Sequence, residues 1–374
     1  MIIFQEDIIN SIIIVLLIFI FTSMSANKLK ISQVFNLLIN TFIMFCTAFK
    51  FNLEQHIQTD ATFYYRLGLS GTNIEFGTNF IGSLSGYLSN ILNLGFLPIF
   101  ILFSSFSVFA IQIVYNVLRA FGVDQQHNLI KYAIVGIIII SIGFWGAGLN
   151  KEGVAFLGIA LFCSSMKSDR IKIIQLLIAI FLISLARPHI GVIALAAVFV
   201  AMIFGQNARK SERIILSSIA ILSIVFILPF VVQYIGIGTL SQSDVVSFTE
   251  SKSELYADTS GYINIRDLSL PIKVFSYIFR PFVWEARSPL QLASSIINLI
   301  LLALMIFFVR PFGKPKWLFF SVHQIALAAF FIVGIIVLAT TTPNLGISNR
   351  QKWMFVIPMF VFLIARSIKT RPLA

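Results

Sequence analysis

The chain has 374 residues, of which 58% are hydrophobic and only 11% are charged, and its net charge is +12. A soluble domain has no room to bury that much apolar surface, because its exterior must stay in contact with water. Apolar runs of about twenty residues instead fit the hydrocarbon core of a bilayer. These runs are continuous rather than alternating, which favours helices over a barrel. We therefore expect an all-α polytopic membrane protein that forms a single transmembrane domain over residues 1–374.

Eleven apolar segments are candidates for membrane-spanning helices. The first run follows Glu6 and Asp7 and has neither a basic start nor a small-residue cleavage pattern. We interpret it as a retained first helix and not as a signal peptide. In chain order the segments are 8–26, 31–49, 94–117, 130–148, 153–166, 173–186, 191–206, 214–236, 289–309, 317–340 and 353–366.

The connections between these segments alternate in charge. Six of them hold 16 of the 27 Lys and Arg residues but only three of the 15 acids, which are Asp124, Asp169 and Glu212. Because basic connections stay in the cytoplasm, the N-terminus is predicted to lie outside and the C-terminus in the cytoplasm. The basic excess is then an orientation signal, and no nucleic-acid partner is expected. The basic residues of these segments are Lys28, Lys30, Arg119, Lys131, Lys167, Arg170, Lys172, Arg209, Lys210, Arg213, Arg310, Lys314, Lys316, Arg366, Lys369 and Arg371.

Two of the outside connections are long, covering residues 50–93 and 237–288. Loops of this length in a compact protein are usually functional. Both are moderately apolar and aromatic, so we expect short interfacial helices packed on the bundle. The functional site is therefore predicted to face the outside.

Cations gather in three short outside turns, which read GLNKEG (148–153), ARPHIG (186–191) and NLGISNRQKW (344–353). A solvated turn with snorkelling side chains would explain any one of them alone. Several on one face favour a cationic pocket for an anionic ligand, since the planar fork of arginine binds phosphate oxygens in pairs. The candidate cations are Arg66, Arg187, Arg266, Arg280, Arg287, Arg350, Lys151 and Lys352.

Carboxylates are fewer on that face, and Asp60 in TDATFYYRLG is the main candidate. On a helix, Asp60 would share a face with Tyr64 at the i,i+4 spacing. Asp60 is either a general base acting on a hydroxyl or the N-cap of the helix that follows. Glu75, Glu152 and Glu285 are reserve candidates, and Glu285 lies between two arginines that could simply pair with it.

Aromatic and cysteine residues complete the survey. Trp284, in RPFVWEAR, either stacks on a sugar face or packs at the membrane interface. Cys46 and Cys163 lie in apolar runs, which is typical of buried packing. The sequence contains no phosphate-binding Gly loop, no Ser-His-Asp order, no dinucleotide fingerprint and no metal-ligand spacing. We therefore expect neither a nucleotide cofactor nor a metal.

Five stretches of the chain, within about residues 60–366, resemble the GT-C-like family of integral membrane glycosyltransferases. They read DATFYYRLG, SIGFWGAGLNKEGVAFLGIALF, ARPHIG, YIFRPFVWEARSPLQLASSIINL and NLGISNRQKW. The pattern is most similar to bacterial repeat-unit polymerases for O-antigen or capsular polysaccharide. The resemblance implies a lipopolysaccharide or capsule enzyme of the bacterial inner membrane. Such an enzyme transfers a growing glycan from undecaprenyl diphosphate to the sugar hydroxyl of an incoming lipid-linked repeat unit at the periplasmic face.

The resemblance also implies roles and partners. Asp60 would be the catalytic carboxylate of the first loop, and Arg187, Arg280 and Arg350 would meet the diphosphate. That loop lacks the second adjacent acid of metal-dependent relatives, so a metal is not expected. The partners would be the undecaprenyl-diphosphate-linked oligosaccharide, membrane lipid and a polysaccharide chain-length regulator. The other residues expected to bind substrate are Lys151, His189, Tyr64, Tyr65, Arg66, Trp284, Glu285 and Arg287.

Two other functions fit much of the same pattern. A GT-C transferase that adds one sugar from a polyprenyl-phosphate donor would share the fold and the cationic pocket. A transporter or flippase of lipid-linked oligosaccharide would instead need polar residues along an interior path, and often internal repeats. The mid-span polar residues are few, with His323 and Gln324 as the main pair. Charge concentrated at the outer face favours an enzyme.

Overall fold

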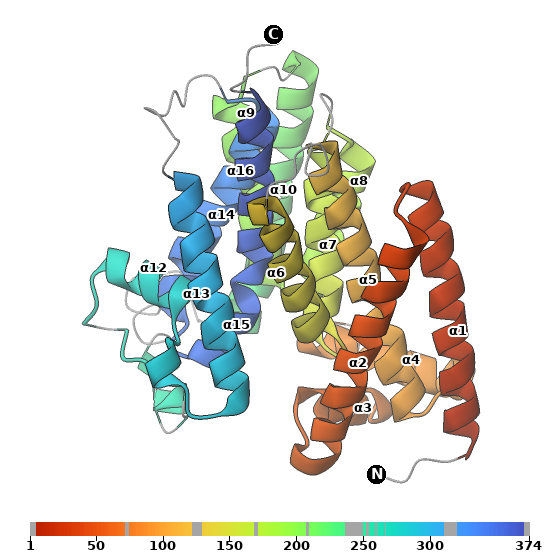
Figure 1. The fold of residues 1–374 in the computed structure, drawn as a ribbon. Coiled ribbons are helices and arrows are strands. Elements are labelled where there is room, and N and C mark those ends of the chain that lie inside the picture. Colours follow the sequence, from red (N-terminus) through yellow and green to blue (C-terminus); the bar gives the residue numbers. More distant parts are fainter. Residues whose placement is uncertain are drawn as a thin grey trace. The chain divides into compact units, whose positions relative to one another are not determined.

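A computed structural model gives the fold of the chain (Figure 1). It describes residues 5–71, 75–121, 129–167, 171–206, 209–235, 250–251, 254–257, 259, 261–265, 267–309 and 320–369. Within these residues the structure is helical, with isolated bridges and no strand. The elements are α1 (Gln5–Lys28), α2 (Gln33–Ile57), α3 (Asp60–Leu69), α4 (Thr78–Leu92), α5 (Phe96–Ala120), α6 (Leu129–Gly146), α7 (Lys151–Ser165), α8 (Ile173–Ala186), α9 (Pro188–Phe204), α10 (Lys210–Ile235), α12 (Leu270–Phe279), the 3-10 turn η1 (Val283–Glu285), α13 (Pro289–Val309), α14 (Val322–Thr341), α15 (Leu345–Gln351) and α16 (Trp353–Lys369).

The prediction of an all-helical chain is confirmed for the described residues, and each of the eleven predicted segments falls on a helix. Five helices, α1, α2, α5, α13 and α14, are long and apolar enough to cross a bilayer. Several shorter helices are also apolar. Together they indicate a protein embedded in a membrane, while the number of crossings and their orientation remain predictions.

The chain divides into two compact units. Unit 1 comprises residues 1–126 and 138–191, and unit 2 comprises residues 127–137 and 192–374. The division falls within α6 and α9.

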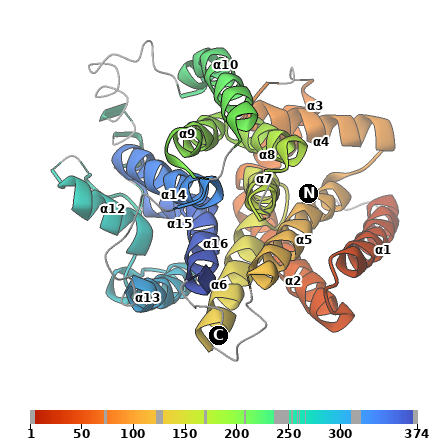
Figure 2. The same cartoon turned by 90° about the horizontal axis from the view of Figure 1, so that it is seen from above.

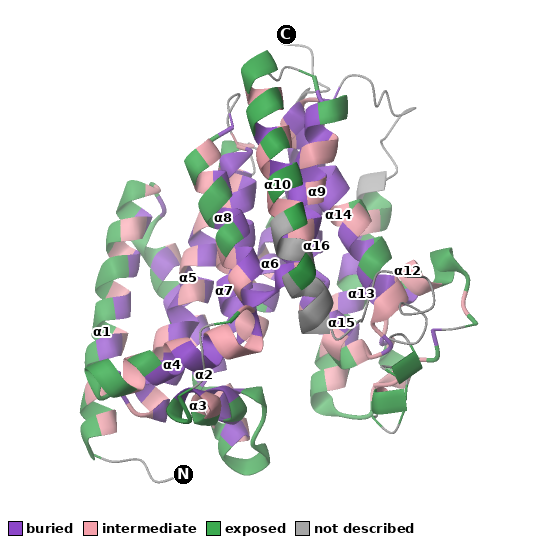
Figure 3. Ribbon diagram, turned by 180° about the vertical axis from the view of Figure 1, so that it is seen from behind, coloured by how far each residue is buried: buried purple, intermediate pink, exposed green. Residues whose placement is uncertain are grey.

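Helix α7 forms the centre of unit 1, where it packs against α5 and α8. It is almost wholly buried, whereas α1 leaves one side exposed (Figure 3). Close helix approach depends on glycine, because a Cβ on Gly158 would lie 3.0 Å from the Ala179 carbonyl oxygen. Small residues allow such approaches between apolar helices.

A buried polar junction joins α1, α2 and α5 of unit 1. The Gln112 side-chain amide donates to the Thr22 carbonyl at 2.9 Å and to Asn36 Oδ1 at 2.6 Å. Asn40 donates to Asn36 Oδ1 at 3.1 Å. Hydrogen bonds of this kind hold helices together where the surroundings are apolar. These residues lie within predicted spans, in addition to the predicted mid-span polar pair His323 and Gln324.

One end of unit 1 is basic. Asn116 on α5 donates to the Leu29 carbonyl at 3.0 Å and accepts from the ammonium of Lys167 at 2.7 Å. Arg119 donates to the Lys30 carbonyl. Three predicted cytoplasmic connections therefore meet at one end of this unit. Of the other charged residues used for orientation, Asp124, Asp169, Arg170, Arg310, Lys314, Lys316 and Arg371 lie outside the described residues.

Helices α3 and α4 lie in the first long predicted loop, at the end of unit 1 opposite the basic connections, and run side by side (Figure 2). They cross at Gly68 and Gly86, where a Cβ on Gly68 would lie 2.3 Å from the Gly82 carbonyl oxygen. The second long loop contributes α12 and η1, and residues 236–249 of it lie outside the described residues.

Unit 2 is built around α16. Residues 353–365 of this helix are all buried, and α14 packs along it. A Cβ on Gly334 of α14 would lie 2.0 Å from the ring of Phe355, so glycine is required at this contact. Helices α12 and α15 also pack together in this unit, close to the start of α16.

Candidate functional site

The GLNKEG turn of unit 1 is held tightly against α5. Gly148 has a φ of 84°, and a Cβ there would lie 2.4 Å from the ring of Phe100. Its N–H donates to Ser104 Oγ at 2.8 Å. Asn150 then caps α7, because its Oδ1 accepts from the Gly153 N–H at 2.8 Å. This local chemistry sets the start of α7 and hence the positions of Lys151 and Glu152.

Arg187 and Glu152 form a buried ion pair. Arg187 is the C-cap of α8, and Glu152 is the second residue of α7. The two residues are 6% and 3% exposed, and one terminal nitrogen of the guanidinium donates to Glu152 Oε1. The Nε–H of Arg187 is buried and has no acceptor among the described residues. Part of the hydrogen-bonding capacity of this guanidinium is therefore unused.

Two lysines lie at the GLNKEG turn, from which α7 and Glu152 begin. The ammonium of Lys151 donates to Thr78 Oγ1 on α4 at 3.0 Å and lies 5.7 Å from the ring centroid of Tyr64 on α3. Lys50 on α2 donates to the Ala147 carbonyl at 2.7 Å, at the start of the turn. We call Lys50, Lys151, Glu152 and Arg187 the Arg187 cluster. Its three cations and one carboxylate leave a net positive charge at the end of unit 1 opposite the basic connections.

His189 belongs to the same end of unit 1. It is half-buried, lies in the first turn of α9, and follows Arg187 by two residues. The predicted residues Lys151, Arg187, His189 and Tyr64 are thus placed in one unit. The carboxylate that pairs with Arg187 had been only a reserve candidate.

Asp60 is exposed and is the first residue of α3, so the N-cap of that helix is Thr59 and not Asp60. The capping acceptor comes from α2. The buried carboxylate of Glu54 accepts the N–H of Thr59 at 2.7 Å and the N–H of Thr62 at 2.8 Å. Tyr64 is buried, although it is four residues from the exposed Asp60. The role of Asp60 as a base remains a prediction.

Glu54 is a residue that the sequence analysis missed. It sits near the C-terminal end of α2 and serves the next helix, so no capping pattern within α3 reveals it. The neighbouring predicted residues are less buried. Tyr65 is half-buried with its ring 5.2 Å from that of Phe96, and Arg66 is exposed. Glu75 is exposed and accepts from Asn79 at 2.7 Å.

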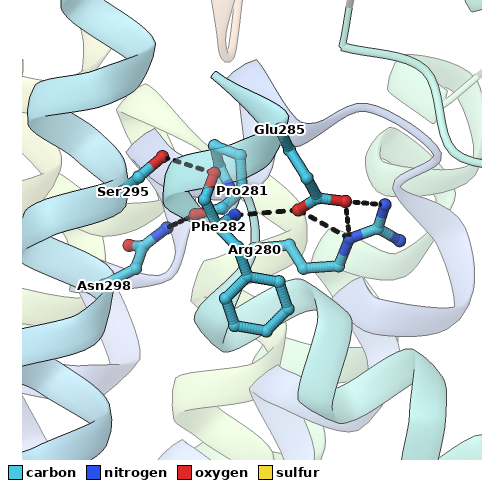
Figure 4. A network of polar contacts seen from close by, with 6 residues as sticks. All are labelled: Arg280, Pro281, Phe282, Glu285, Ser295 and Asn298. Atoms are coloured by element: carbon cyan, nitrogen blue, oxygen red, sulfur yellow. Dashed lines mark hydrogen bonds and ion pairs between the residues drawn. The ribbon is translucent and has the colours of Figure 1, made fainter.

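In unit 2, Arg280 and Glu285 form an ion pair at the end of α12 (Figure 4). Arg280 Nε donates to Glu285 Oε1 at 2.9 Å, and the Phe282 N–H donates to Glu285 Oε2 at 2.8 Å. Partial burial acts to raise the pKa of the Glu285 carboxyl, but these hydrogen bonds and the charge of Arg280 outweigh it. The net effect lowers the pKa of Glu285 below its usual value.

Helix α13 holds the same segment from the other side. Asn298 donates to the Pro281 carbonyl and Ser295 donates to the Phe282 carbonyl, both at 3.1 Å (Figure 4). Glu285 is thus paired with one of its two flanking arginines. The other, Arg287, is exposed, and its backbone N–H donates to Gln291 Oε1 at 2.7 Å.

Trp284 is 78% exposed and stacks on Phe282 with ring centroids 4.8 Å apart. One face of the indole therefore packs on protein, while the side chain as a whole is open to its surroundings. Arg350 lies on α15 of unit 2 and is half-buried. Arg266 lies outside the described residues.

Lys352 is completely buried in unit 2. Its ammonium donates to the Ile278 carbonyl at 2.9 Å, to Asn349 Oδ1 at 2.7 Å and to Asn298 Oδ1. Three N–H donors meet three oxygen acceptors, so Lys352, the C-cap of α15, joins α12, α13 and α15. The prediction treated it as a cation open to a ligand, but its donors are already used within the protein. Asn298 and Asn349 were also missed.

Comparisons with protein-family models, with characterised proteins and with solved structures return no match for this chain.

Proposed function

We propose that this protein is a membrane-embedded glycosyltransferase that polymerises glycan repeat units carried on a polyprenyl diphosphate. The observation that carries the proposal is the Arg187 cluster. A buried guanidinium with an unused Nε–H lies beside Lys151 at one end of an apolar helical unit. Arginine suits phosphate oxygens because its planar fork offers several N–H donors with fixed geometry.

The electrostatics of the cluster support an anionic ligand. Within the cluster, three cations accompany one carboxylate, and the Glu152 carboxylate pairs with Arg187. A diphosphate held at the end of helices keeps its polyprenyl chain beside apolar surface, such as the exposed side of α1. A lipid-linked diphosphate therefore fits the combination of apolar frame and cationic end better than a soluble anion does.

In the proposed reaction, a sugar hydroxyl of the acceptor attacks the anomeric carbon that bears the diphosphate. The new glycosidic bond forms as the bond from that carbon to the diphosphate oxygen breaks, and the diphosphate leaves with the electron pair. Arg187 and Lys151 stabilise the charge that develops on it. Asp60 accepts the hydroxyl proton.

The test uses the full chain, purified and reconstituted in liposomes of phosphatidylethanolamine and phosphatidylglycerol. The liposomes carry undecaprenyl-diphosphate-linked repeat units, and products are separated on a gel. We expect a ladder of lengthened glycans with release of undecaprenyl diphosphate. Arg187→Lys should lower the rate at least tenfold, because an ammonium replaces the bidentate fork. Arg119→Ala, at the basic end of the same unit, is the matched control and should leave the rate unchanged.

Other results would assign another function. Addition of one sugar from a polyprenyl-phosphate donor, with no ladder, would point to a single-sugar transferase. Movement of the lipid-linked glycan across the bilayer without a new glycosidic bond would point to a flippase. If the wild type and Arg187→Lys form the glycan ladder at equal rates, Arg187 does not bind the diphosphate.

A further inference from the structure

A pocket lies in unit 1 where the end of α2, helix α3 and the start of α5 meet. It lies apart from the residues of the Arg187 cluster. Its lining residues are Glu54, Gln55, Gln58, Thr62, Arg66 and Phe96. Only Arg66 among them was a predicted substrate residue, and the pocket has no role in the reaction proposed above.

The rim of the pocket offers hydrogen-bonding groups. Gln55, Gln58 and Arg66 are exposed, and their side chains have no hydrogen-bond or ion-pair partner among the described residues. The two amides supply both donors and acceptors, and the guanidinium supplies donors. This mixture of donors and acceptors suits hydroxyl groups, each of which both donates and accepts.

Phe96 gives the pocket an apolar aromatic wall. It is 5% exposed, and it is supported by the rings of Phe51, Tyr65 and Phe100, with centroids 5.7, 5.2 and 5.6 Å away. An aromatic surface beside a few convergent polar groups is the usual composition of a small-molecule site. The C–H face of a sugar ring packs against such a surface.

The pocket is held in shape by Glu54. Its carboxylate accepts N–H groups of α3, and its backbone carbonyl accepts the Gln58 N–H at 3.1 Å. Gln58 ends α2 with a φ of 47°, a left-handed conformation that a non-glycine residue adopts only under constraint. These contacts fix the end of α2 against the start of α3, and residues of both helices line the pocket.

We propose that this pocket binds a neutral sugar residue of the glycan. A neutral ligand fits because the lining carries one guanidinium, that of Arg66, and one carboxylate, that of Glu54, and so has no net charge. The inference rests on the proposed function and extends it.

Tyr64 contacts Lys151 from α3, whereas Thr62 and Arg66, on the other side of this helix, line the pocket. The pocket and the Arg187 cluster are therefore separated by about one helix diameter, or ~10 Å. The bound sugar would not be the one that reacts. Its binding would position the glycan relative to the reacting centre.

The test measures sugar binding alone, without lipid carrier or transfer. The full chain in nanodiscs is mixed with the methyl glycosides of glucose, galactose, mannose and N-acetylglucosamine, and binding is measured by saturation-transfer NMR. We expect saturation transfer to at least one glycoside. Arg66→Ala and the double variant Gln55→Ala/Gln58→Ala should each weaken its binding about tenfold, which is the effect of losing one or two hydrogen bonds. His56→Ala is the control. His56 is exposed and adjacent to Gln55, but it does not line the pocket, so this variant should bind the glycoside as the wild type does.

Each result decides the matter. If no glycoside receives saturation from the wild type, or if Arg66→Ala and the double variant bind as tightly as His56→Ala, the proposal is overturned. Thermal unfolding of each variant identifies any loss that comes from misfolding, and Gln55→Glu, which keeps size and polarity, replaces a misfolded variant. Sugar binding without polymerisation in liposomes would instead count against the proposed reaction alone.

Discussion

Arg187 ends α8 and pairs with Glu152, 35 residues earlier, at the start of α7. Each charge lies at the helix end that favours it, a cation at the C-terminus and an acid at the N-terminus. The pair therefore complements two helix dipoles as well as its own charges. Both side chains are buried, so removing either one leaves the other in the interior without this ion-pair partner.

This pairing predicts strong coupling between the two residues. Arg187→Met and Glu152→Gln should each lower the free energy of unfolding by about 3–5 kcal/mol, because each leaves one buried partner unmatched. The double variant Arg187→Met/Glu152→Gln should lose much less than the sum. SDS-induced unfolding in mixed micelles, followed by circular dichroism, measures all three. Additive losses in this double-mutant cycle would show that the ion pair does not couple the two helices.

The GLNKEG turn makes a second prediction at Gly148. Its positive φ and the contact with Phe100 both exclude a side chain. Gly148→Ala should lower the free energy of unfolding by roughly 1–3 kcal/mol. Gly136→Ala is the matched control, because a Cβ at this position of α6 meets no atom within 4 Å. That control should be neutral or stabilising by up to about 1 kcal/mol, since alanine is the better helix former. Equal effects of the two substitutions would contradict a constrained turn.

Lys352 carries a third prediction. Lys352→Met keeps an unbranched side chain that is one atom shorter, and it removes all three hydrogen bonds. It leaves buried oxygens of Ile278, Asn298 and Asn349 without this donor. We expect a loss of about 2–4 kcal/mol in the free energy of unfolding. Lys210→Met, at an exposed position of α10, should change it by less than about 0.5 kcal/mol. A wild-type unfolding curve for Lys352→Met would mean that the buried ammonium does not stabilise unit 2.

Hydropathy was sufficient to predict the helices, because an apolar segment long enough to enter a bilayer must satisfy its backbone hydrogen bonds internally. It also placed the polar turn around Lys151 at a helix end. It was not sufficient to predict partners. Glu152 meets Arg187, and Lys352 meets Asn298, only through the packing of helices that are far apart in sequence. No local pattern encodes such contacts, which is also why Glu54 was missed as the cap of α3.

The pH dependence of unit 2 gives the last prediction. Glu285 has a pKa below its usual value of 4.5 in the folded protein, because Arg280 and the Phe282 N–H hold its charged form. Its stabilisation is therefore fully present above the unfolded-state pKa and is lost as pH falls through the lower folded-state pKa. Hydrogen exchange of the α12–α13 segment, measured between pH 3 and 7, should show weaker protection in Glu285→Gln than in the wild type above about pH 5. That difference should shrink as the pH falls below about 4.5, where the wild-type carboxyl begins to take up a proton on unfolding. A difference that stays constant down to pH 3 would mean that the Arg280 pair is not what stabilises this segment.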